Sequence, residues 1–128
     1  MRILLDTHIA LWAITDSPQM PRLARALVAD PANDIVVSAA SVWEIAIKHG
    51  LGRGNMPVSG ADALSYFREA GYQLVPVSAE QAAFVETLPP IHSDPFDRIL
   101  VAQAICEPMR LLTHDQNIAC YSESVILT

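Results

Sequence analysis

Cysteine is scarce in this sequence, and so are long hydrophobic runs. The only two cysteines, Cys106 and Cys120, have no second cysteine or histidine at the spacing of metal ligands, so neither a disulfide framework nor a zinc site is indicated. We expect both to be buried as small hydrophobic side chains. The apolar N-terminus is interrupted at Asp6, too early for a signal peptide, and no stretch approaches the length of a membrane span. A cytoplasmic protein that does not engage a membrane is therefore expected.

Basic residues are also few. Eight Lys and Arg stand against 14 Asp and Glu, which gives a net charge of -6. A negative net charge is unfavourable for a protein that binds nucleic acid, itself negatively charged, through electrostatics alone. It suits one that gathers acids around a divalent cation, because the cation reverses the local charge and can itself contact phosphate.

What the chain has in quantity is apolar material. Hydrophobic residues make up 52% of the 128 residues and charged residues only 17%, a balance that favours a compact, well-packed protein over a disordered one. The length is close to the commonest size of one domain, so we predict a single domain over residues 1–128.

Short apolar runs alternate with helical patterns along the chain. The predicted strands are 3–5, 35–37, 74–77, 111–112 and 125–127, and the predicted helices are 7–14, 21–31, 39–49, 59–71, 78–88 and 94–107. Such alternation predicts an α/β fold with a central, mostly parallel, five-stranded twisted sheet flanked by helices on both faces. In these sheets, ligands bind at the carboxyl ends of the strands.

Four acids fall toward that edge. Asp6 directly follows the first strand, and Asp115 comes shortly after the strand at 111–112. Glu44 lies about one and a half turns into the helix after the second strand, and Asp97 lies in the first turn of its helix. All four can therefore face the carboxyl edge.

Each acid also has a structural interpretation. Asp6 can serve as the N-cap of its helix, and Asp115 can form an Asx turn. Glu44 can complete a capping box with Ser41, or pair with Lys48 on a solvated face. These interpretations do not explain why acids from four separate elements share one edge.

The predicted burial of Glu44 and Asp97 favours their interpretation as metal ligands. The residues around Glu44 are apolar on nearly every side, so its helix is predicted to be buried all round, and the helix of Asp97 has little polar surface. A buried charge needs metal coordination or an ion pair, for which Arg98 is the candidate beside Asp97. A shared Mg²⁺, completed by substrate phosphate, explains the four acids together and fits phosphodiester chemistry.

Other polar residues give weaker indications of function. The four histidines, His8, His49, His92 and His114, lack the mutual spacing of a metal site or of a nucleophile and its base, so we interpret them as structural or surface residues. Lys48 and Arg53 can contact a phosphate backbone, although a solvated helix end is the simpler interpretation.

The motifs at residues 6–8, 42–48, 92–104 and 111–115 resemble PIN-domain ribonucleases of the VapC type, the toxins of bacterial toxin–antitoxin pairs. The resemblance spans nearly the whole chain in the right order. The segment from His92 to Arg98, followed by its apolar helix, is its most specific part.

The resemblance implies both a site and an activity. The acids implied to hold Mg²⁺ or Mn²⁺ and to act in catalysis are Asp6, Glu44, Asp97 and Asp115, and the implied pocket neighbours are Thr7, Asp94 and Thr113, of which Asp94 can be a cap, an outer acid or both. The implied activity is hydrolysis of RNA phosphodiester bonds by a homodimeric endoribonuclease that a cognate antitoxin neutralises.

Two other classes of function stay open. A phosphatase with an aspartate nucleophile would normally carry a second acid two residues later, where this chain has His8, and a receiver domain would need a lysine near its last strand, whereas Lys48 is the only lysine. A catalytically silent binding module that keeps the fold is the non-enzymatic alternative. Metal-dependent RNA cleavage would separate both from the main hypothesis.

Overall fold

A parallel sheet forms the centre of the computed structural model, which describes residues 1–52 and 56–128. The five strands are ordered β3-β2-β1-β4-β5, and every neighbouring pair is parallel. Their bounds are β1 Arg2–Leu5, β2 Asp34–Ser38, β3 Gln73–Val75, β4 Arg110–Thr113 and β5 Ile126–Leu127. The predicted five-stranded α/β fold is therefore confirmed.

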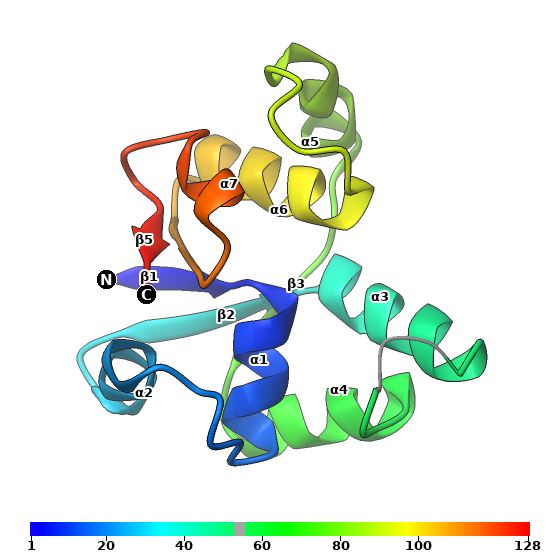
Figure 1. Ribbon diagram of the computed structural model, residues 1–128, viewed down its shortest axis with the longest axis vertical. Coiled ribbons are helices and arrows are strands. Elements are labelled where there is room, and N and C mark those ends of the chain that lie inside the picture. The colour runs from blue at the N-terminus through cyan, green and yellow to red at the C-terminus, as the bar shows by residue number, and fades with distance from the viewer. Residues whose placement is uncertain (53–55) are drawn as a thin grey trace.

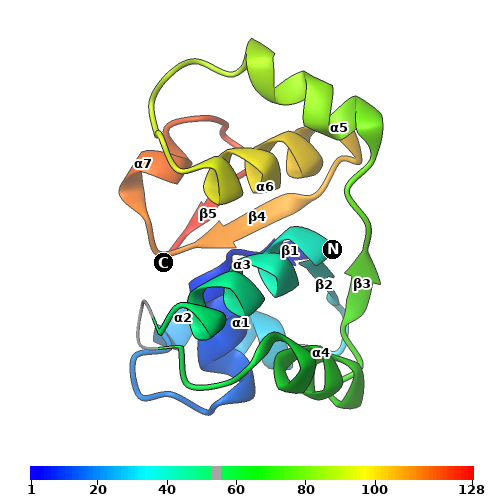
Figure 2. The same cartoon turned by 90° about the vertical axis from the view of Figure 1, so that its right-hand side faces the viewer.

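Helices cover both faces of the sheet (Figure 1). On one face lie α1, α2 and α4, on the other α5, α6 and α7, while α3 extends away from the carboxyl edge, between α4 and α6 (Figure 2). The bounds are α1 Thr7–Ile14, α2 Arg22–Ala29, α3 Ala39–Gly50, α4 Gly60–Glu69, α5 Ala79–Phe84, a 3₁₀ turn η1 Val85–Thr87, α6 Pro95–Cys106 and α7 Gln116–Ala119. In the parts of the chain just described, no helix combines the length and the apolar character that crossing a bilayer requires.

The core has two halves because side chains alternate across the sheet. In β1, Ile3 and Leu5 face the α1, α2 and α4 layer, whereas Leu4 faces the layer around α6. Helix α3 joins both halves, since Ile45 packs in the first and Ala40 in the second. This fixes where α3 leaves the sheet, and with it the position of any side chain on its inner face.

The local signals account for most boundaries. The Ser78 and Gln81 capping box forms at the start of α5, and Asp94 caps α6, where Pro95 occupies the first turn. Strand β3 ends at Val75 rather than at the predicted residue 77, because Pro76 has no backbone N–H to continue the ladder. The short helix α7 was not predicted.

Two burial predictions were wrong. Cys106 and Cys120 are exposed, because each lies at the C-terminal end of a helix rather than on its inner face. Helix α3 is not buried all round: Ala39, Trp43 and Ala46 form an exposed stripe, and Trp43 is 62% exposed. An apolar stripe facing outward is typical of an interface, not of a core.

Candidate metal centre at the carboxyl edge

The end of β1 places Asp6 inside the protein. Its backbone N–H donates to Leu112 O at 2.9 Å, which holds it between β1 and β4, and the residue is only 4% exposed. Oδ2 accepts a hydrogen bond from Thr113 Oγ1 at 2.7 Å, whereas Oδ1 is buried without a hydrogen-bond partner among the described residues. Although Asp6 occupies the N-cap position of α1, its side chain makes no capping bond there. Capping alone therefore does not explain this acid.

The two threonines differ in what they contact. Thr113 Oγ1 donates to Asp6 and accepts from the backbone N–H of Asp115 at 3.0 Å, so it links two of the acids across the sheet edge. The Thr7 hydroxyl instead donates to Ser41 Oγ at 2.9 Å and ties α1 to α3. Thr113 is thus the threonine whose hydroxyl contacts a carboxylate of the site.

Glu44 reaches the same region from α3 and is 2% exposed. Its capping interpretation is wrong, because Ser38 caps α3 and Ser41 is engaged by Thr7. The ion pair with Lys48 is present at 2.5 Å, but it lies in a largely buried setting rather than on a solvated face. The other oxygen, Oε1, is buried without a partner in the described part of the chain. Glu44 therefore keeps one open acceptor.

Lys48 belongs to this charge cluster. Burial by itself would lower the pKa of its ammonium, but the hydrogen bond and charge of Glu44, together with Asp94 and Asp97, raise that pKa above its ordinary value. The lysine is thus held charged among several acids. Arg53, the other basic residue predicted to contact RNA or a partner, lies outside the described residues.

The pKa of Asp97 is shifted by its buried, acidic surroundings. Burial, followed by the negative charges of Asp6 and Asp94, raises the pKa of Asp97 to about 7, while His92 opposes the shift. Arg98 does not supply the expected ion pair: its guanidinium donates to backbone carbonyls of residues 85–92 and to Tyr121 Oη. Asp97 therefore remains a carboxylate short of positive charge.

The pKa of Asp6 is raised as well. Burial raises the pKa of Asp6 and the charge of Glu44 adds to the shift, whereas Thr113 and His8 oppose it. Raised carboxylate pKa values in a shared site mean that the acids repel one another and are poorly solvated. A cation placed among them would relieve both effects.

Asp94 and Asp115 combine capping with proximity to the site. Asp94 Oδ1 accepts from the backbone N–H groups of Phe96 and Asp97, as expected of an N-cap, and Asp115 Oδ1 accepts from Asn117 N at 2.8 Å to cap α7. The Asx-type role predicted for Asp115 is therefore present. Its second oxygen faces His92 Nε2 at 3.1 Å.

The sequence places His92 beside the acids, but its interpretation as a structural or surface residue missed its contact with two of them. Its Nε2 lies 3.2 Å from Asp97 Oδ2 and 3.1 Å from Asp115 Oδ2, between two acids that the chain separates by 18 positions. One ligand atom from each of these three residues lies within 4.8 Å of the others. Histidine spacing gave no signal, because the neighbours of His92 are carboxylates rather than other histidines.

The donor set fits a hard divalent cation. Oxygen ligands from carboxylates suit Mg²⁺ and Mn²⁺, and such ions use only a few protein carboxylates while substrate and water complete the shell. Such a cation would satisfy the two buried oxygens without partners, on Asp6 and Glu44, and would offset the repulsion that raises the pKa values of Asp6 and Asp97.

Comparisons with known proteins agree on one family. The model of the PIN domain family matches residues 3–123. A curated relative, ribonuclease VapC22 of Mycobacterium tuberculosis, is 29% identical over 117 residues, covering 91% of this chain and 88% of that protein.

Solved structures share the fold at lower identity. VapBC2 from Rickettsia felis bound to a promoter DNA fragment gives a TM-score of 0.69 at 19% identity, covering 100% of this chain and 98% of that one. VapBC-1 from nontypeable Haemophilus influenzae gives 0.65 at 17%, covering 100% and 97%. FitAcB from Neisseria gonorrhoeae gives 0.58 at 19%, covering 98% and 96%.

Proposed function

The chain belongs to the PIN-domain family, and from that premise we propose that it is a metal-dependent endoribonuclease toxin that a cognate antitoxin neutralises. The names of the similar proteins support the proposal: one is a ribonuclease, and several neighbours in structure are toxin–antitoxin complexes. We place the activity in the cytoplasm, where its proposed RNA substrate is found.

The observation that carries the proposal is the pair of buried, unpartnered carboxylate oxygens on Asp6 and Glu44, beside an Asp97 whose pKa is raised to about 7. We propose that Asp6, Glu44, Asp97 and Asp115 hold Mg²⁺, for which Mn²⁺ can substitute. A bound divalent cation supplies Lewis-acid polarisation of the phosphodiester and activation of a water molecule. The carboxylates position it, and Thr113 orients Asp6 by its hydrogen bond.

Lys48 has two roles to reconcile in this proposal. In the metal-free protein its ammonium neutralises Glu44 and lies near Asp94 and Asp97. A bound cation would supply that positive charge to Glu44, and the flexible side chain of Lys48 could then contact an RNA phosphate at the site rim. This assigns the chain's only lysine to substrate binding, with Arg53 as a second candidate.

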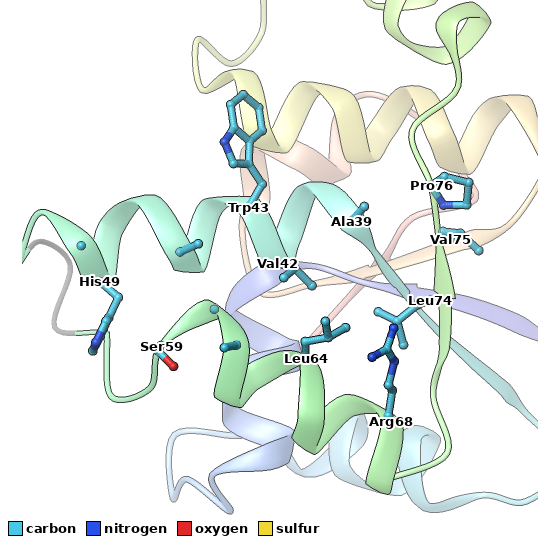
Figure 3. Close-up of a pocket in the computed structure, with 14 residues that line it drawn as sticks. Ala39, Val42, Trp43, His49, Ser59, Leu64, Arg68, Leu74, Val75 and Pro76 are labelled. Carbon is cyan, nitrogen blue, oxygen red and sulfur yellow. The ribbon is translucent and has the colours of Figure 1, made fainter.

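Protein partners follow from charge and from apolar surface. A basic side chain of the antitoxin would be attracted to the same acids and would exclude RNA from them. The surface around Trp43 is the proposed contact between two copies in a homodimer: Trp43 projects from α3 above a hollow lined by Ala39, Val42, Leu64, Leu74 and Val75 (Figure 3). Trp43 also packs edge-on against Phe96, with ring centroids 5.1 Å apart.

The test is cleavage of single-stranded RNA by the purified protein. We expect cleavage with Mg²⁺ or Mn²⁺, loss with EDTA, and loss in Asp97→Asn. Asp34→Asn, which changes an exposed acid at the amino end of β2, is the matched control and should cleave like the wild type. Cleavage that EDTA does not affect, or an active Asp97→Asn protein, would refute the proposal; hydrolysis of phosphomonoesters without RNA cleavage would favour the phosphatase alternative.

A further inference from the structure

The imidazole ring of His92 lies between two of the proposed metal ligands, Asp97 and Asp115. His92 lies in the loop between η1 and α6, and its Nε2 is within hydrogen-bond distance of Asp97 Oδ2 and of Asp115 Oδ2. A nitrogen beside two carboxylate oxygens looks at first like a third metal ligand. The other ring nitrogen argues against this.

That other nitrogen reveals the tautomer. The backbone N–H of Asp94 donates to His92 Nδ1 at 3.1 Å, so Nδ1 is the accepting nitrogen of the ring. The proton is then on Nε2, which faces the carboxylates as a donor. A histidine that binds metal normally donates its remaining N–H to an acceptor, the reverse of what Asp94 imposes here.

The chain fixes the ring in this place through its backbone. The N–H of His92 donates to Tyr121 Oη at 2.8 Å, and its carbonyl accepts from Arg98 Nη1 at 3.3 Å. Arg98 also holds the preceding residues through the carbonyls of Val85 and Pro89, at 3.0 and 3.1 Å. Arg98 is adjacent to Asp97 in the sequence, but its guanidinium therefore hydrogen-bonds the His92 loop rather than Asp97.

We propose that His92 is a positioning residue of the metal centre: its Nε2–H donates to Asp115 Oδ2 and lies against Asp97 Oδ2, and it thereby sets the orientation of both carboxylates. The inference rests on the proposed metal site. Asp115 then has both oxygens engaged by protein donors, Oδ1 by Asn117 and Oδ2 by His92. Asp115 can still bind a cation, because a carboxylate oxygen that accepts one hydrogen bond keeps a second lone pair, and the buried oxygens of Asp6 and Glu44 have no protein donor among the described residues.

Two near-isosteric substitutions separate the roles of the two ring nitrogens. His92→Asn keeps an acceptor near Nδ1 for the Asp94 N–H, so the loop is preserved, but it has no donor that reaches the carboxylates. His92→Gln carries its amide donor at the position of Nε2. We expect His92→Asn to lower Mn²⁺ affinity by about 10–100-fold, as loss of an outer-shell partner typically does, and His92→Gln to recover most of that loss.

Affinity is measured by calorimetric titration of the metal-free proteins with Mn²⁺, without RNA, and circular dichroism checks that each variant is folded. Wild-type Mn²⁺ affinity in His92→Asn, or tighter binding, would overturn the proposal. Because RNA is absent, the result is separate from the nuclease proposal: a wild-type protein whose Mn²⁺ affinity depends on His92 but that cleaves no RNA would refute only the latter.

A second measurement needs no variant. The ¹⁵N shifts of the His92 ring in the metal-free wild-type protein distinguish the two tautomers. We expect the Nε2–H form. The Nδ1–H form would leave Nε2 free to bind metal and would overturn the proposed role, even if His92→Asn failed to fold.

Discussion

Replacing Asp97 by asparagine should stabilise the metal-free protein, even though it is expected to abolish activity. The carboxylate of Asp97 is 16% exposed and lies near the charges of Asp6 and Asp94, so its ionisation is costly in the folded state. Asparagine has nearly the same shape and carries no charge. It keeps the backbone N–H that Asp94 Oδ1 accepts in capping α6.

The magnitude follows from the raised pKa. The folded value of about 7, against 3.8 for the unfolded chain, differs by about three units, which corresponds to about 4 kcal/mol at full ionisation. Between these two values the folded protein binds more protons than the unfolded protein, so the stability contributed by this group falls as the pH rises. The advantage of Asp97→Asn is therefore absent below about pH 4, grows through the interval, and reaches its full value above about pH 7.

The assay is equilibrium urea unfolding of the wild type and Asp97→Asn in EDTA across this pH range. Asp34→Asn serves as the matched control, because its exposed carboxylate lies at the opposite edge of the sheet. Mn²⁺ should then narrow the difference: at 100 times its dissociation constant a ligand stabilises the protein that binds it by about 2.7 kcal/mol, and the variant should gain less.

One outcome would refute this reasoning. If Asp97→Asn is no more stable than the wild type at about pH 8, or if the difference between the two does not change with pH, the charge of Asp97 is already compensated in the metal-free protein. The electrostatic argument for a cation at this site would then fail.

Three further predictions concern the site and its partners. Glu44→Gln should lower Mn²⁺ affinity by at least about tenfold in calorimetry, as expected of a ligand that loses its charge, and wild-type turnover would return Glu44 to a structural role. Lys48→Met should raise Mn²⁺ affinity, by roughly tenfold if its ion pair contributes about 1.4 kcal/mol, while RNA affinity measured by fluorescence anisotropy falls. Trp43→Ser should yield monomers in sedimentation at concentrations where the wild type is dimeric, and an unchanged dimer would place the interface elsewhere.

Much of the fold could be predicted because short-range signals and the sheet agree. Apolar runs at 3–5 and 35–37 are buried strands, and the caps at Ser78 and Asp94 start the helices that they predict. In a parallel sheet these signals also determine which residues reach the carboxyl edge. Asp6 and Asp115 could thus be placed near each other although 109 positions separate them in the sequence.

The remaining features depend on contacts between distant segments. Trp43 lies within a helix that is apolar on nearly every side, and sequence alone does not say which side meets solvent. His92 reaches the acids only because Arg98 and Tyr121, from separate elements, hold its loop. No local pattern encodes that arrangement. Arg98 misled the prediction for the same reason, since adjacency to Asp97 suggested a pair that the loop carbonyls prevent.

The negative charge of the protein and its proposed RNA substrate are reconciled by where the charges lie. A protein with a net charge of -6 gains little from long-range attraction to a polyanion, so affinity must come from a local reversal of charge at the site. In the proposed mechanism, a divalent cation bound by the buried acids would provide this reversal. Without the cation the site would stay acidic, and Lys48 pairs with Glu44. The same acids would attract a basic antitoxin segment when no metal is bound. Substrate and inhibitor would then be distinguished by the charge state of one site rather than by two separate surfaces.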